Sequence, residues 1–117
     1  AVIGVGHFGS LHAEKYAAMD HVDLVAVVDQ DIDRANNIAT RYGCKALTDY
    51  TKLAGQVDAV SLAVPTSLHY EFGQTVLEMG IHLLVEKMIK HSSTLLLTRK
   101  SLALKRAYKT QISKVIL

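Results

Sequence analysis

The sequence predicts an α/β fold: a doubly wound parallel sheet covered by helices on both faces, in a three-layer α/β/α arrangement. Over residues 1–88, short apolar runs alternate with segments of helical periodicity. The runs are continuous, which is typical of strands buried on both faces, and the first of them leads into a glycine-rich turn. Strands that alternate with helices of about ten residues imply right-handed crossovers and parallel pairing.

The first half of the chain contains two expected strands and two expected helices. Residues 1–5 form a short apolar run interrupted by glycine, and a helix is expected from about residue 8 to residue 19. Leu24–Val28 is the second apolar run. Asp31 can cap the next helix, and Gly43 stands where a helix C-terminal glycine is expected. Apolar residues of that helix follow the spacing of one buried face: Ala35, Ile38, Ala39 and Tyr42.

The second half adds three strands and one helix, followed by a less regular tail. Cys44–Leu47 predicts a weak short strand, and residues 57–64 predict a strong one that ends at a proline. A helix is expected from about Ser67, and Ile81–Val85 is the last clear strand. In the tail, residues 92–105 are expected to form a helix and residues 111–117 a strand.

The glycine-rich turn fits the G-x-G-x-x-G pattern over residues 4–9, after a strand and at the start of a helix. Gly4 permits a tight turn, Gly6 lets the backbone approach a diphosphate, and Gly9 lets the helix lie close to the sheet. Asp29 follows Gly9 by twenty residues, at the end of the second strand. These features predict a dinucleotide site; the alternative is a glycine turn that serves packing alone.

The expected anion site consists of main-chain amides at the start of the first helix, around His7 and Phe8. The Asp29 carboxylate would accept hydrogen bonds from the adenosine ribose and repel a 2′-phosphate, which favours NAD over NADP as cofactor. We expect Arg34 to point along its helix and to pair with Asp31. The alternative for Asp29 is a turn or helix-capping acid.

Four ordered blocks of the chain together resemble the Gfo/Idh/MocA oxidoreductase family, from residue 2 to about residue 87. They are the glycine turn followed by His12, then Val28-Asp29, then Ala63-Val-Pro-Thr-Ser-Leu-His69, then Gly80-Ile-His-Leu-Leu-Val-Glu-Lys87. The resemblance implies a Rossmann-type NAD(P)-binding domain over residues 1–88 and a dehydrogenase of sugar-like or cyclitol-like secondary alcohols.

The resemblance also implies a second domain that carries most substrate contacts, a catalytic histidine or other acid/base group, and the interface of a homo-oligomer. We expect this chain to lack that domain, and to lack a few residues before its first strand. The alternatives are a non-catalytic dinucleotide-binding protein and a truncated product.

By resemblance, Lys87 is the catalytic residue, and it contacts both substrate and the nicotinamide side of the cofactor. An ammonium group there would stabilise the developing negative charge of the alcohol oxygen and relay its proton. Glu86 is expected to orient its neighbours at the cofactor rather than to react. Without the family resemblance, an equally good interpretation is that Glu86 and Lys87 form an exposed ion pair at the end of the strand, which contributes little to stability.

Further cofactor contacts are expected at the end of the fourth strand. Val64, Pro65 and Thr66 lie there, and the resemblance implies that Thr66 contacts the ribose next to nicotinamide. His69 is either a cofactor contact or a helix-surface or capping histidine. His12 is expected to pack within the first helix.

Charge divides the chain sharply. Residues 1–88 carry six Lys/Arg against eleven Asp/Glu, net −5, whereas residues 89–117 carry seven Lys/Arg and no acid, net +7. The family has proline where this chain has Met88, and the basic tail departs from the family pattern. We interpret the tail as the product of a shifted reading frame or aberrant splice; the alternatives are an interaction helix and a nucleic-acid-binding arm, which the near absence of aromatic residues disfavours.

Composition excludes several other classes. No apolar run approaches the length of a membrane span. The histidines lack metal-ligand spacing, and the single cysteine, Cys44, cannot form an internal disulfide and reads as a small buried hydrophobe. We therefore expect no metal site, no membrane partner and a cytoplasmic location.

Overall fold

The computed structural model describes residues 1–86 and 94–97 of the chain. Its strands are β1 (Val2–Ile3), β2 (Ala26–Val28), β3 (Lys45–Leu47), β4 (Ala59–Leu62), β5 (His82–Glu86) and β6 (Thr94–Leu97). Its helices are α1 (His7–Ala17), α2 (Ile32–Tyr42) and α3 (His69–Glu78), with 3₁₀ helices η1 (Tyr50–Leu53) and η2 (Thr66–Leu68). The strand order is β3-β2-β1-β4-β5-β6. Strands β1 to β5 pair in parallel, which confirms the doubly wound arrangement.

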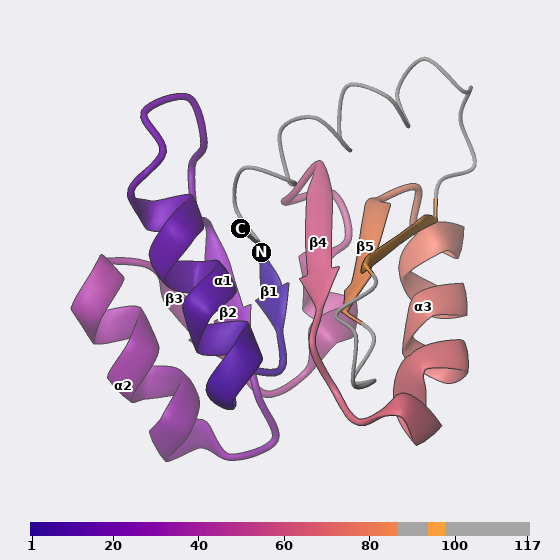
Figure 1. Ribbon diagram of the computed structural model, residues 1–117, viewed down its shortest axis with the longest axis horizontal. Helices are drawn as coiled ribbons and strands as arrows, with labels where there is room; N and C mark the ends of the chain where they lie inside the picture. The colour runs from indigo at the N-terminus through magenta and orange to yellow at the C-terminus, as the bar shows by residue number, and fades with distance from the viewer. Residues whose placement is uncertain (87–93, 98–117) are drawn as a thin grey trace.

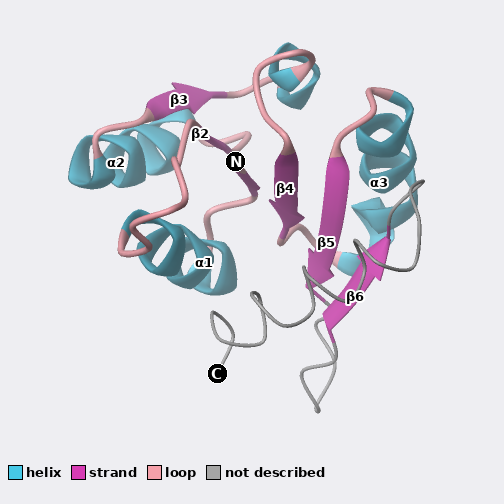
Figure 2. Cartoon of the chain, turned by 90° about the horizontal axis from the view of Figure 1, so that it is seen from above, coloured by secondary structure: helices cyan, strands magenta, loops and turns pink. Residues whose placement is uncertain are grey.

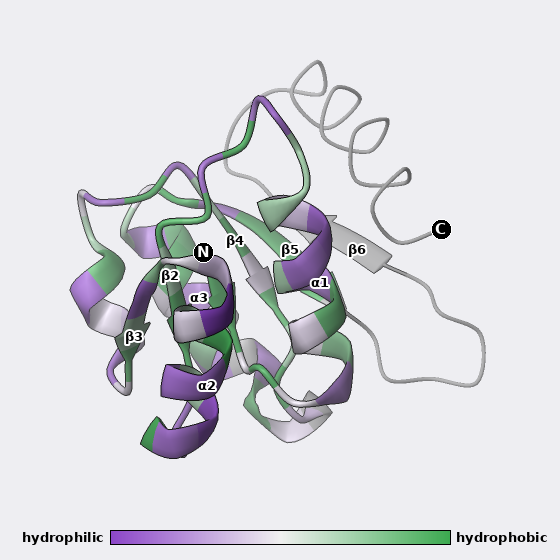
Figure 3. Ribbon diagram, turned by 90° about the vertical axis from the view of Figure 1, so that its left-hand side faces the viewer, coloured by the Kyte–Doolittle hydropathy of each residue, from purple (hydrophilic) through white to green (hydrophobic). Residues whose placement is uncertain are grey.

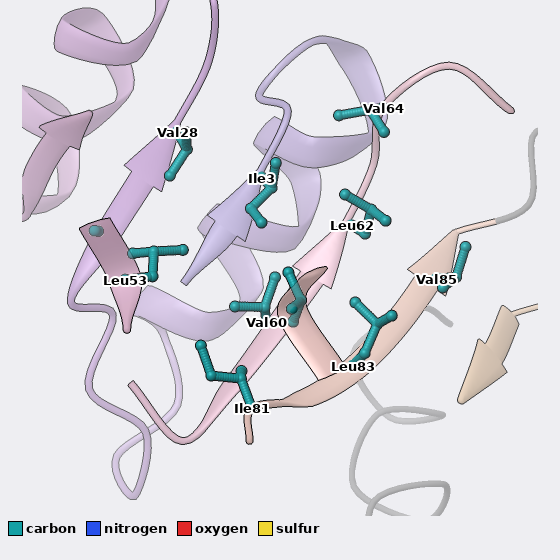
Figure 4. Packing of buried hydrophobic residues seen from close by; sticks show 11 residues of the cluster. Ile3, Val28, Leu53, Val60, Leu62, Val64, Ile81, Leu83 and Val85 are labelled. Atoms are coloured by element: carbon teal, nitrogen blue, oxygen red, sulfur yellow. The ribbon is translucent and has the colours of Figure 1, made fainter. Parts of the chain in front are cut away.

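Helices cover both faces of the sheet, with α1 and α2 on one face and α3 on the other (Figures 1 and 2). Consecutive residues of β1 therefore enter different cores: Val2 packs with Ala13 of α1, and Ile3 packs with Leu53 and Leu83. Figure 4 shows the core that contains Ile3, where residues of β1, β2, β4 and β5 converge. Each fully buried aliphatic side chain stabilises the fold by roughly 1.5–3 kcal/mol.

Helix α2 forms as the sequence predicts. The Asp31 carboxylate caps it by accepting hydrogen bonds from the amides of Asp33 and Arg34, at 3.1 and 3.2 Å. Gly43 ends it in the left-handed conformation, with φ of +70°. Its outer face is hydrophilic (Figure 3), and three residues of the expected inner face are buried: Ala35, Ile38 and Ala39.

Two helical segments differ from expectation. The helix expected from Ser67 begins as the 3₁₀ turn η2, and α3 proper starts at His69. The 3₁₀ helix η1 was not predicted, because four residues are too few to show periodicity. Asp49 caps η1 by accepting a hydrogen bond from the Thr51 amide at 2.9 Å.

The sequence predicts a helix over residues 92–105, and this prediction is wrong for Thr94–Leu97, which form β6. This strand pairs antiparallel with β5, with Leu96 opposite Leu84. The physical reason is that the edge of β5 offers unpaired N–H and C=O groups, which a short apolar segment without a helical stripe can satisfy. The strand expected over residues 111–117 lies outside the described residues.

Candidate functional site

The turn between β1 and α1 is built on two glycines that the fold itself requires. Gly4 has φ of +86°, and a Cβ there would lie 2.7 Å from the carbonyl oxygen of Ala63. Its amide donates to the Val28 carbonyl oxygen at 2.7 Å, which holds the turn against the end of β2. A Cβ on Gly9 would lie 1.6 Å from the Gly4 carbonyl oxygen, so α1 packs directly on the turn. These roles agree with the sequence analysis.

Gly6 differs from the other two glycines. The nearest atom to a Cβ built on it is Nη1 of Arg34, 3.8 Å away. Gly6 is also the N-cap residue of α1, and no side chain caps that helix or supplies a negative charge in its first turn. The space in front of Gly6 therefore faces main-chain amides at the positive end of a helix dipole, where an anion is favoured.

Asp29 lies directly after β2 and ties three segments together. Its Oδ2 accepts a hydrogen bond from the Val5 amide at 3.0 Å, and its Oδ1 accepts one from the Asp31 amide at 2.9 Å. Nη1 of Arg34 lies 3.6 Å from Oδ2. The expected pairing of Arg34 with Asp31 is thus corrected, because Asp31 accepts from the first-turn amides of α2 while Arg34 lies against Asp29.

A cavity of about 830 Å³ opens at the carboxyl ends of the parallel strands, and we call it the carboxyl-edge cleft. Seven of the predicted site residues line it: Gly4, Gly6, His7, Phe8, Asp29, Val64 and Pro65. Gly9 lies beneath it, buried under the turn. Thr66 is in η2 and Glu86 ends β5, and the side chains of both are outside what the structure describes. Lys87 lies outside the described residues.

His69 does not line the cleft. Its Nε2 donates to the Val64 carbonyl oxygen at 2.8 Å, five residues back, so it holds the segment that follows β4. Of the alternatives that the sequence left open for this histidine, the observed contact is structural. It fixes the part of the backbone from which Val64 and Pro65 face the cleft.

Several residues of the cleft escaped the sequence analysis. Tyr50 of η1 and Phe72 of α3 stack with their ring centroids 4.3 Å apart at 23°, and form an apolar wall. Asp49 beside them accepts hydrogen bonds from the hydroxyl and amide of Thr51, which hold the pKa of Asp49 below its usual range. Their position in the sequence could have indicated them: residues 48–50 follow β3, and parallel strands all end at the same edge of a sheet.

A second cavity, of about 580 Å³, opens at the amino ends of the strands. It is lined by Asp23 and Asp58 among others, and it has neither a glycine turn nor a helix N-terminus. Among the described residues, the combination of a glycine turn and a helix N-terminus is therefore found at the carboxyl edge. Over the described ranges 1–86 and 94–97, no group of three or more potential metal ligands comes together, and no helix is long and apolar enough to span a membrane.

The strand order, the glycine turn and the position of the cleft define a Rossmann-type nucleotide-binding domain. The chain belongs to the Gfo/Idh/MocA oxidoreductase family, NAD-binding Rossmann fold, whose model matches residues 1–95. It is 42% identical over 86 residues to UDP-N-acetylglucosamine 3-dehydrogenase of Acidithiobacillus ferrooxidans, covering 74% of this chain and 27% of the relative. It is 38% identical over 96 residues to inositol 2-dehydrogenase 4 of Saccharopolyspora erythraea, covering 79% and 28%.

Solved structures agree with these similarities. GenD2 from gentamicin A biosynthesis, crystallised in complex with NAD, matches with a TM-score of 0.71 and 35% identity, over 74% of this chain and 25% of that one. The structure of GnnA, the UDP-N-acetylglucosamine 3-dehydrogenase of Acidithiobacillus ferrooxidans, matches with a TM-score of 0.69, over 74% of this chain and 28% of that one. The chain thus spans about a quarter of the length of its relatives.

Proposed function

We propose that residues 1–88 bind NAD or NADP in the carboxyl-edge cleft, as the cofactor-binding part of an oxidoreductase. The observation that supports this most directly is the contrast among the three glycines. A side chain at Gly4 or Gly9 would collide with the chain's own backbone. At Gly6 the nearest atom to an added Cβ is 3.8 Å away, so packing within the chain does not explain why this residue is glycine. A diphosphate held by the amides of His7 and Phe8 explains it.

The strand order supports one orientation for the cofactor. Strands β2 and β4 flank β1 on opposite sides, so Asp29 and Val64 lie on opposite sides of the glycine turn. We assign the adenosine ribose to the side of Asp29, and the nicotinamide ribose to the side of Val64, Pro65 and Thr66. A carboxylate beside the adenosine ribose favours NAD over NADP.

The proposed reaction is the oxidation of a secondary alcohol of a sugar or cyclitol, as the names of the relatives suggest. When bound, the nicotinamide ring supplies the acceptor for the hydride that leaves the carbinol carbon. Lys87, which follows β5 directly in the sequence, would as an ammonium stabilise the negative charge that develops on the alcohol oxygen and relay the hydroxyl proton towards solvent, so that a carbonyl is formed. Glu86 would orient that lysine. Substrate contacts would come mainly from the part of the relatives that this chain does not span.

A titration with NADH tests the cofactor site. The chain contains no tryptophan, so nicotinamide fluorescence can be followed without indole overlap. We expect saturable binding by the wild-type chain and at least tenfold weaker binding by Gly6→Ala, about 1.4 kcal/mol, because the added methyl group fills the space of the diphosphate. The melting temperature of Gly6→Ala should match that of the wild type.

Gly73→Ala is the matched control, because Gly73 lies outside the cleft and its added Cβ would meet only the ends of two leucine side chains, Cδ2 of Leu83 at 3.1 Å and Cδ2 of Leu62 at 4.0 Å. This control should bind NADH as the wild type does. Equal affinities of Gly6→Ala and the wild type would sink the proposed site. We expect no measurable turnover of inositols or aldoses by the 117-residue chain, because most of the substrate contacts would be missing.

A further inference from the structure

The cavity of about 580 Å³, which we call the amino-edge cavity, lies at the opposite end of the strands from the carboxyl-edge cleft. Apolar side chains of β4, β5 and the segments that precede β2 and β4 line it: Leu24, Val25, Val57, Val60 and Leu84. Two exposed acidic residues, Asp23 and Asp58, also line it. Among the described residues around this cavity, none is a lysine or an arginine. The cavity therefore suits an occupant that is both apolar and positively charged.

Strand β6 brings the chain to this end of the sheet. Strand β5 runs parallel to β4, toward the carboxyl edge, and β6 returns beside it in the antiparallel direction (Figure 2). The last residue of β6, Leu97, pairs with Leu83, and Leu96 pairs with Leu84, which lines the amino-edge cavity. The chain therefore leaves β6 beside the cavity, and residues 98–117 follow.

Residues 98–117, which we call the basic C-terminal segment, lie outside the described residues and have the composition that the cavity suits. The segment has no Asp or Glu, and its basic residues are Arg99, Lys100, Lys105, Arg106, Lys109 and Lys114. Apolar residues stand among them and end the chain at Val115-Ile-Leu117. Fully extended, the segment would reach roughly 65 Å, whereas β2 lies only about 20 Å from β6 across the sheet. Its length therefore allows it to reach every wall of the cavity.

We propose that the basic C-terminal segment docks in the amino-edge cavity of its own chain. Its lysine and arginine side chains pair with Asp23 and Asp58, and its apolar side chains cover the apolar walls. Attachment to β6 favours this segment over a free peptide, because it holds the occupant at a high effective concentration beside the cavity. Residues 1–88 carry a net charge of −5, which attracts the segment further. Docking at the amino edge leaves the carboxyl-edge cleft open, so it is independent of cofactor binding.

Carbodiimide cross-linking of the 117-residue chain tests this contact, because the reagent joins a lysine amine to a carboxylate that it touches. We expect mass spectrometry to find links from lysines of the segment to Asp23 or Asp58. These links should decrease in about 1 M sodium chloride, which screens the attraction. A mixture of isotope-labelled and unlabelled chains identifies the occupant: links between the two kinds of chain would show that a second copy fills the cavity, and would overturn the proposal. Absence of links to Asp23 and Asp58 would overturn it as well.

Hydrogen exchange followed by mass spectrometry tests the same contact without a reagent. The double variant Asp23→Asn/Asp58→Asn removes the two carboxylates of the cavity. Its matched control, Glu14→Gln/Glu71→Gln, makes the same change in net charge at two exposed residues outside both cavities. Amides of residues 98–117 should exchange roughly threefold to tenfold faster in the first variant, because two partly exposed ion pairs are lost, and at the wild-type rate in the control.

Equal exchange rates of this segment in the wild type and in both variants would refute the docking. Circular dichroism checks that each variant is folded. Both variants should bind NADH as the wild type does, because the cofactor cleft lies at the other edge of the sheet. If the wild-type chain does not bind NADH, the proposed function fails, whereas the cross-links and the exchange rates still decide whether the segment docks.

Discussion

Replacing Gly9 with alanine should destabilise the fold, although alanine is the better helix former. The added Cβ would lie 1.6 Å from the Gly4 carbonyl oxygen and 2.7 Å from its carbonyl carbon. Because the obstacle is backbone, no side-chain rotation relieves the overlap. Reaching 3.0 Å, the shortest separation that real Cβ atoms show, needs a movement of about 1.4 Å between α1 and the turn.

Such a movement pulls α1 away from the sheet, where Ala13 is fully buried and the hydroxyl groups of Tyr16 and Ser61 are hydrogen-bonded. Overpacking typically costs about 1–3 kcal/mol, and a rigid obstacle puts this site at the upper end. The higher helix propensity of alanine returns about 1 kcal/mol. The net loss of about 2 kcal/mol corresponds to a decrease of about 10 °C in melting temperature.

Thermal unfolding followed by circular dichroism measures this effect. Gly73→Ala is again the matched control: it also adds a methyl group to a helical glycine, but its nearest neighbour is the end of a flexible leucine side chain. That variant should melt close to the wild type, and NADH binding should be lost in Gly9→Ala alone. If Gly9→Ala melted within two or three degrees of the wild type, the close packing of α1 on the turn would be refuted.

Three further outcomes are expected. Asp29→Asn should lower both the melting temperature and NADH affinity in the same titrations, because an amide group would face a main-chain N–H, at a cost of about 1–3 kcal/mol. His69→Ala should weaken NADH binding a few-fold and lower the free energy of unfolding in urea by about 1 kcal/mol, through loss of the bond to Val64. Burial raises the pKa of the Cys44 thiol, so mass spectrometry should find slower alkylation of the folded chain than of the unfolded chain at pH 8. For the same reason, the free energy of unfolding should fall as the pH rises above the ordinary thiol pKa, because the unfolded chain loses its proton first.

The sequence predicted the sheet well because each strand carries its own signal. Continuous apolar runs specified strands buried on both faces, and Asp31 and Gly43 specified the ends of α2. The five parallel strands and their helices followed from these local patterns. The segment Thr94–Leu97 carried no such signal: its leucines fit neither a helical stripe nor an alternating strand, and its pairing with β5 decided its conformation.

The site was predicted less completely, because parts of it depend on competition between groups. Three carboxylates lie near Arg34 in sequence, Asp29, Asp31 and Asp33, and the sequence analysis paired Arg34 with Asp31. The structure reverses that choice because the first-turn amides of α2 bind Asp31. The wall formed by Tyr50 and Phe72 brings together residues from distant elements, so no local pattern could have revealed it.

Substitutions of Asp29 cannot distinguish an effect on cofactor binding from an effect on the fold, because this residue serves both. Its carboxylate holds the glycine turn through the Val5 amide and the start of the β2–α2 connection through the Asp31 amide. Any change to it alters the shape of the cleft as well as the group offered to a ribose, so lost affinity in an Asp29 variant has two causes. Gly6 and Arg34 border the same cleft without such duties in the fold. Substitutions at these two residues can therefore change cofactor binding while the melting temperature stays constant, and that separation distinguishes a nucleotide site from a well-packed turn.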